Sequence, residues 1–214
     1  MLCELPLVRC ERFICLFCHC NLPQTNYHIH KANPARDLFA GFTQVNEVAA
    51  YLFFEKEGAT QKLLHSLKYY GNKELAFYLG QTAAIAYKKE GFCASVDTIV
   101  PIPLHPNKKK RRGYNQSEWI GKGFAAVYGC EMETKRISRV TDTKTQTRKS
   151  IYDRHVNVEK VFNISEPAFF VGKHILLIDD VITTGATVSA CIEAFLPIPD
   201  VKISIFSLSI AREY

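Results

Sequence analysis

The stretch from His174 to Ala190, HILLIDDVITTGATVSA, decides the fold class of this chain. Its first part, His174 to Ile178, is an uninterrupted apolar run, typical of a strand buried on both faces, as in a parallel sheet. Two carboxylates, Asp179 and Asp180, end the run, and a loop of small residues leads into a predicted helix over Val188 to Phe195. Open α/β sheets bind ligands in such loops. The stretch therefore predicts a binding site.

The residue types in this loop suit an anion beside a pair of hydroxyls. Small residues at the start of a helix leave the backbone N–H groups accessible to a phosphate. Gly185 adds backbone freedom, and Thr183, Thr184 and Thr187 add hydroxyl donors. The carboxylates accept hydrogen bonds from hydroxyl groups, each contributing ~1.5–3 kcal/mol. Together these groups predict a ribose 5-phosphate site, whereas an ordinary turn and helix cap would leave the acid pair unexplained.

The segment from Asp179 to Thr187, DDVITTGAT, resembles the phosphoribosyl pyrophosphate (PRPP) binding signature of type I phosphoribosyltransferases. The resemblance implies that the acids hold the ribose 2- and 3-hydroxyls, that the loop holds the 5-phosphate, and that Mg²⁺ accompanies PRPP. It also implies catalysis by positioning and charge stabilisation, without a protein nucleophile. The implied PRPP-binding residues are Asp179, Asp180, Val181, Thr183, Thr184, Gly185, Ala186 and Thr187.

The rest of the chain predicts a mainly parallel sheet with helices between its strands. Strands are expected over Val48 to Phe54, Asp97 to Pro103, Lys135 to Val140 and Val201 to Ile210. Helices are expected over Ala59 to Tyr70, Lys73 to Tyr87 and Asn115 to Tyr128. This alternation is typical of βαβ units, so the predicted class is α/β.

Composition agrees with a globular enzyme. The chain has 214 residues, of which 47% are hydrophobic, and no window is apolar enough for a membrane span. Glu4, Pro6 and Arg9 interrupt the amino terminus where a signal peptide would be apolar, so we expect a cytoplasmic protein. The eight cysteines then indicate reduced thiols or a metal site. A net charge of +6 favours polyanionic ligands.

A second candidate site begins at Val100 to His105 (VPIPLH) and continues into the basic run Lys108 to Arg112 (KKKRR). A basic run alone is typical of a solvated surface or a nucleic-acid patch. In the phosphoribosyltransferase fold that the signature implies, however, the loop after an earlier strand faces the pyrophosphate. We expect Lys108 to Lys110 to stay in solvent. The residues expected to face the pyrophosphate are Pro103, Leu104, His105 and Arg112.

A third candidate is the polar segment from Thr141 to Ser150, TDTKTQTRKS, which has no apolar residue to pack. Such a loop can close over a substrate and exclude water from a reactive anomeric centre. Arg148 and Lys149 would then join Asp179 and Asp180 as catalytic residues by contacting the departing pyrophosphate. A plain surface loop is the alternative.

Several segments together resemble the ComF family of competence-associated proteins. They are the cysteine-bearing start, LKYYGN (Leu67 to Asn72), VPIPLH, RRGYNQS (Arg111 to Ser117), TQTRKS and DDVITTGAT. The resemblance implies a type I phosphoribosyltransferase fold over residues 26–214, behind a small zinc-finger-like module at residues 1–25. It also implies a link to the uptake of transforming DNA in bacteria.

The cysteines of the amino terminus depart from the family pattern of two Cys-x-x-Cys pairs. Cys15 and Cys18 form one such pair, but Cys3 and Cys10 lie seven residues apart. The metal ligands that the resemblance implies for Zn²⁺ are Cys3, Cys15, Cys18 and Cys20, and reduced surface thiols are the alternative. The remaining cysteines sit in apolar surroundings typical of core residues.

Two hypotheses about function follow. The first is Mg²⁺-dependent transfer of a phosphoribosyl group from PRPP to an acceptor, a base or an amine that the sequence does not identify. A glutamine-hydrolysing amidotransferase is excluded, because residue 2 is Leu and the chain is too short for that domain. The second is a non-catalytic adaptor that binds single-stranded DNA or DNA-uptake proteins, which the KKKRR run favours.

Overall fold

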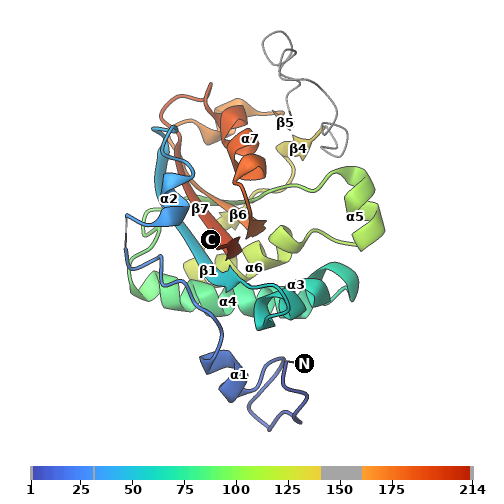
Figure 1. Ribbon diagram of the computed structural model, residues 1–214. Helices are drawn as coiled ribbons and strands as arrows, with labels where there is room; N and C mark the ends of the chain where they lie inside the picture. Colours follow the sequence, from blue (N-terminus) through green and yellow to red (C-terminus); the bar gives the residue numbers. More distant parts are fainter. Residues whose placement is uncertain (1, 31, 141–160, 213–214) are drawn as a thin grey trace.

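A five-stranded parallel sheet forms the centre of the computed structural model, which describes residues 2–30, 32–140 and 161–212 (Figure 1). Its strands follow the order β1-β7-β6-β2-β3, and every pair of neighbours is parallel. They are β1 (Val45–Phe54), β2 (Thr98–Pro101), β3 (Glu131–Met132), β6 (His174–Ile182) and β7 (Lys202–Ala211). The predicted α/β class and mainly parallel sheet are confirmed.

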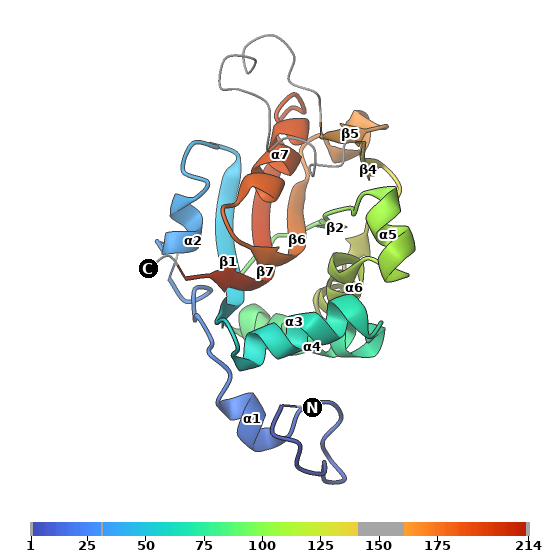
Figure 2. The same cartoon turned by 45° about the vertical axis from the view of Figure 1, so that its right-hand side comes forward.

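Helices cover both faces of this sheet (Figure 2). On one face lie α3 (Ala59–Tyr69), α4 (Lys73–Lys89) and α6 (Gln116–Tyr128); on the other lie α7 (Ala186–Phe195) and α2 (Pro34–Asp37). Successive strand residues point to opposite faces, so β6 contributes Leu176 and Ile178 to the first core and Ile175 and Leu177 to the second. Each face of the sheet thus has its own apolar core.

Strand β6 continues beyond the point at which the apolar run ends. The sequence predicts a strand that stops at the two carboxylates, whereas β6 runs through them to Ile182. Its backbone pairs with β7 along this extension, with Asp179 opposite Ser207 and Val181 opposite Ser209. The extension therefore holds both acids within the strand, at its carboxyl end.

Several short elements were not predicted. The basic run lies in a helix, α5 (Pro106–Arg112), with proline in its first turn and Gly113 at its end with φ of 77°. Without apolar residues it shows no helical periodicity in sequence. The others are α1 (Leu16–Cys20), β3, η3 (Pro167–Phe170) and β5 (Phe162–Ile164), which pairs antiparallel with β4 (Ile137–Arg139), the strand expected over Lys135 to Val140. No helix in the described ranges is long and apolar enough to cross a membrane.

The cysteine-bearing start of the chain lies beyond the layer of α3 and α4 (Figure 1). Ile14 is buried and belongs to the same core as those helices, and the ring of Phe13 lies 5.5 Å from that of Tyr78 in α4. Further along, Gln24 forms an antiparallel bridge with Leu52 of β1. The start of the chain is thus packed against the domain that contains the sheet.

Two glycines, Gly80 in α4 and Gly123 in α6, allow these helices to approach closely. A Cβ on Gly123 would overlap the carbonyl oxygen of Phe77 and lie 2.5 Å from the Gln81 nitrogen. We expect Gly123→Ala to lower the free energy of unfolding by about 1–3 kcal/mol, because a helix backbone cannot yield as a side chain can. Urea unfolding measures this change. Gly41→Ala is the control, since nothing lies within 4 Å of its added Cβ. Equal stabilities for the two variants would contradict the prediction.

Candidate functional site

The site lies where the chain connections leave the sheet in opposite directions. After β2 the chain passes through α6 to β3, whereas after β6 it passes through α7 to β7 on the other side. The carboxyl ends of β2 and β6 are neighbours, and the Ile102 N–H donates a hydrogen bond of 2.9 Å to the Ile178 carbonyl. Open α/β sheets bind ligands in the crevice at such a point.

The loop between β6 and α7 forms an open pocket. Its lining is Asp179, Val181, Ile182, Thr183, Thr184, Gly185, Ala186, Thr187 and Val188. None of the backbone N–H groups of residues 183–187 donates a hydrogen bond to a described residue. These donors therefore face the pocket or solvent at the start of a helix, which is the arrangement that binds a phosphate.

Gly185 is required at the turn for two separate reasons. Its φ of 75° lies in the left-handed region that favours glycine. In addition, a Cβ at this position would lie 3.2 and 3.3 Å from two ring atoms of Phe39, which follows α2. The turn is therefore shaped both by its own backbone and by a buried aromatic ring behind it.

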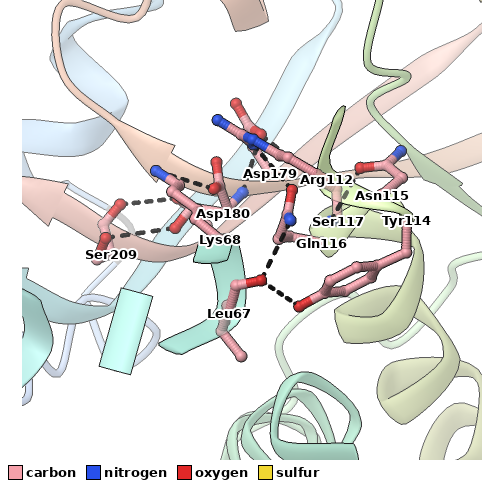
Figure 3. Close-up of polar contacts among 11 residues, drawn as sticks. Leu67, Lys68, Arg112, Tyr114, Asn115, Gln116, Ser117, Asp179, Asp180 and Ser209 are labelled. Carbon is pink, nitrogen blue, oxygen red and sulfur yellow. Dashed lines mark hydrogen bonds and ion pairs between the residues drawn. The ribbon is translucent and has the colours of Figure 1, made fainter. Parts of the chain in front are cut away.

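The Asp179 carboxylate is buried in the site and held by neutral donors (Figure 3). One of its oxygens accepts hydrogen bonds from the Asp180 N–H at 2.8 Å and from the Ser117 hydroxyl at 3.2 Å. Burial raises the pKa of Asp179 to about 7, and the negative charge of Asp180 adds to the rise. This acid therefore gains or loses its proton near neutral pH.

The Asp180 carboxylate instead has a full positive charge beside it. The ammonium of Lys68, in the last turn of α3, lies 3.1 Å from Asp180 Oδ2 (Figure 3). Asp180 is absent from the lining of the loop pocket. Sequence reasoning missed Lys68, although the segment LKYYGN that contains it had been noted as part of the family resemblance.

The segment RGYNQS connects α3 to the site. The Tyr114 hydroxyl and the Gln116 amide, the latter at 3.3 Å, both donate to the carbonyl of Leu67 (Figure 3). The Asn115 amide donates to the Ile102 carbonyl at the end of β2, at 3.0 Å. These buried contacts hold the end of α3, and with it Lys68, beside the carboxyl ends of the strands.

The predicted pyrophosphate-facing residues follow β2. Pro103, Leu104 and His105 are half-buried, and His105 Nδ1 accepts a hydrogen bond from the first turn of α5. The Arg112 guanidinium donates to the Gln116 side chain at 2.9 Å and so lies near the acid pair (Figure 3). Arg148 and Lys149 lie outside the described residues.

The amino terminus brings together three of the four predicted metal ligands. The sulfur atoms of Cys3, Cys15 and Cys18 lie within 4.8 Å of one another. A hydrogen bond from the Leu5 backbone lowers the pKa of Cys3, and the neighbouring Cys3 thiol raises the pKa of Cys18 to about 11. Cys20 does not join this group and is exposed. Two residues after Cys18 in α1, its side chain points to another face of the helix.

Comparisons with known proteins give several relatives, although no protein-family model matches the chain. It is 33% identical to the DNA utilization protein YhgH of Salmonella typhi over 138 residues, which are 63% of this chain and 60% of the relative. The protein of that name from Escherichia coli K12 is 27% identical over 91% of this chain and 89% of its own length. Competence protein ComFC of Streptococcus pneumoniae is 33% identical over 42% of this chain and 38% of its own length.

Proposed function

Since the chain belongs to the ComF family of competence-associated proteins, we propose that it binds PRPP and transfers its phosphoribosyl group to an acceptor nucleophile. The proposal includes a type I phosphoribosyltransferase fold. It is carried by one observation, the open pocket whose unbonded N–H groups lie beside a buried acid at the switch point of the sheet. The reduced thiols of the chain suit the cytoplasm, where we place this activity.

In this proposal the loop from Thr183 to Thr187 binds the 5-phosphate of PRPP. Its N–H groups and hydroxyls supply donors, and the positive end of α7 adds to the attraction. The exposed side chains of Thr183 and Thr184 can reach a ligand without rearrangement of the core. Phosphate binding at this end of the pocket directs the ribose toward Asp179.

The acid pair then orients the ribose, and the residues after β2 receive the pyrophosphate. Asp179 and Asp180 accept hydrogen bonds from the 2- and 3-hydroxyls, while Arg112 lies on the side of the leaving group. When the bond from the anomeric carbon to pyrophosphate breaks, its electron pair leaves with pyrophosphate, and the acceptor forms the new bond. Mg²⁺, when bound with PRPP, neutralises part of the pyrophosphate charge.

The cysteine cluster fits part of a zinc site. Cys3, Cys15 and Cys18 supply three sulfur ligands within reach of one ion, and a closed structural zinc site takes four. We propose that these three residues hold Zn²⁺ and that the ion cross-links the start of the chain. Cys20 lies outside this group of sulfur atoms in the arrangement described.

Titration calorimetry of Mg²⁺–PRPP tests the main proposal. We expect Asp180→Asn to weaken binding by one to two decades, or roughly 1.5–3 kcal/mol, because it removes a charged acceptor of the ribose hydroxyls. Asp200→Asn is the matched control, an exposed acid before β7 at the opposite end of the strands. Absence of PRPP binding by the native protein, or unchanged affinity in Asp180→Asn, would refute the assignment.

The exposed face of α5 favours a second function, the binding of single-stranded DNA in DNA uptake. Lys109, Lys110 and Arg111 are exposed there, next to the proposed pyrophosphate side, and relatives are named for DNA utilization and competence. Phosphate contacts release counterions, so binding by this face should weaken steeply as salt increases. A salt titration with a labelled oligonucleotide, compared with release of pyrophosphate from PRPP, separates this function from the first.

A further inference from the structure

One oxygen of the Asp180 carboxylate, Oδ2, is covered by Lys68. Asp180 Oδ2 is buried and accepts no hydrogen bond from a described residue, although the Lys68 ammonium lies 3.1 Å away. A carboxylate oxygen that has an ion-pair partner but no well-directed hydrogen bond still has lone pairs for a ligand. A ribose hydroxyl can reach this oxygen only if the ammonium moves away.

The main chain beside Lys68 is anchored by hydrogen bonds, while its side chain is partly exposed. The preceding carbonyl, that of Leu67, accepts two hydrogen bonds from RGYNQS, so the end of α3 cannot shift. The Lys68 side chain itself is 20% exposed, compared with 13% for Asp180. The ammonium of a lysine sits on a flexible stem of four carbons. It can therefore change partners while the backbone stays in place.

Gln116 and Arg112 lie on the side of the site where the pyrophosphate would bind. The amide of Gln116 donates to Leu67, and its carbonyl oxygen accepts a hydrogen bond from Arg112 at 2.9 Å. Gln116 thus connects the end of α3, which carries Lys68, to the arginine on the pyrophosphate side (Figure 3). A pyrophosphate arriving there carries several negative charges and would attract the nearest mobile cation.

We propose that Lys68 exchanges partners on ligand binding, from Asp180 before PRPP binds to the pyrophosphate of PRPP in the complex. The inference rests on the proposed function and names a ligand-binding residue that the signature does not contain. The exchange keeps charges paired at each stage. Before binding, the ammonium neutralises a buried carboxylate; afterwards the ribose hydroxyl hydrogen-bonds that carboxylate and the ammonium faces the leaving group.

Two ligands that differ only in the pyrophosphate separate this exchange from a fixed structural role. The experiment is calorimetry at pH 8.5 with ribose 5-phosphate and with Mg²⁺–PRPP, on the native protein, Lys68→Met and Lys68→Arg. Ribose 5-phosphate should bind Lys68→Met up to about fivefold more tightly, since no ion pair has to be broken. PRPP should bind it about tenfold more weakly, because a charged contact to pyrophosphate is lost. Lys68→Arg should retain most of the PRPP affinity.

Lys62→Met is the matched control, an exposed lysine of the same helix, and should change neither affinity. Thermal unfolding of each variant verifies that it is folded. Affinities for both ligands that fall together in Lys68→Met, or that do not change, would overturn the exchange while leaving the proposed function standing. Failure of the native protein to bind either ligand would instead overturn the proposed function, and the exchange with it.

Discussion

Replacing Gly185 with alanine is expected to lower the affinity for PRPP by more than about a hundredfold, the effect of misplacing a binding group by roughly 1 Å. The added Cβ is unfavourable at φ of 75°, and it would lie 3.2 Å from the ring of Phe39. The backbone must move to relieve both contacts. That movement turns the N–H groups of the loop away from the position of the 5-phosphate.

Calorimetry of Mg²⁺–PRPP measures this loss, and Gly172→Ala provides its control. Gly172 also has a positive φ, 69°, but nothing lies within 4 Å of its added Cβ, and it precedes β6 at the opposite end of the strand. Gly172→Ala should therefore share the conformational cost and retain PRPP binding. Binding by Gly185→Ala within a few-fold of the native protein would show that the loop does not hold the phosphate.

The position of the pocket could be predicted from the sequence because its signals are local. One buried strand, its polar loop and the following helix are contiguous from His174 to Ala190, and each has a residue pattern of its own. Lys109 and Lys110 are exposed as predicted, whereas Lys108, also expected in solvent, is half-buried. Short-range patterns thus identify the pocket and part of the basic segment.

The partners of the acids could not be predicted, because they come from distant parts of the chain. Lys68 lies 112 positions before Asp180, and Ser117 lies 62 positions before Asp179. No periodicity within α3 or α6 indicates which polar residue will meet which strand end. The extension of β6 through its carboxylates has a similar origin, since pairing with Ser207 and Ser209 of β7 overrides the low strand preference of aspartate.

These contacts also give the two acids different chemical surroundings. From the sequence the two carboxylates are equivalent acceptors for two hydroxyls, whereas in the structure they are different. Asp179 has neutral hydrogen-bond donors and a raised pKa, and Asp180 has a lysine beside it. The pair is therefore sensitive to pH through one member, Asp179.

Replacing Asp179 with asparagine is expected to stabilise the protein above pH 7. Because the pKa of Asp179 is raised to about 7, the folded protein retains a proton that the unfolded chain loses near pH 4. The free energy of unfolding of the native protein should therefore fall as pH rises from about 4 to about 7. At about 1.4 kcal/mol per pKa unit, this cost reaches roughly 2–4 kcal/mol at pH 8.

Asparagine does not ionise and its side-chain oxygen can still accept hydrogen bonds from Ser117 and from the Asp180 N–H. The melting temperature of Asp179→Asn should thus exceed that of the native protein by roughly 5–15 °C at pH 8, and the difference should disappear near pH 4. Asp200→Asn, which replaces an exposed acid, should show no such dependence. A variant that is no more stable at pH 8 would mean that Asp179 is not a buried, destabilising charge.

The same titration should govern ligand binding. PRPP affinity of the native protein should rise between pH 6 and pH 8, as Asp179 loses its proton and becomes an acceptor for a ribose hydroxyl. In Asp179→Asn the affinity should be lower and nearly independent of pH over this range. Stability and affinity would then change in opposite directions at one side chain, as expected where a buried charge is retained for binding at the expense of stability.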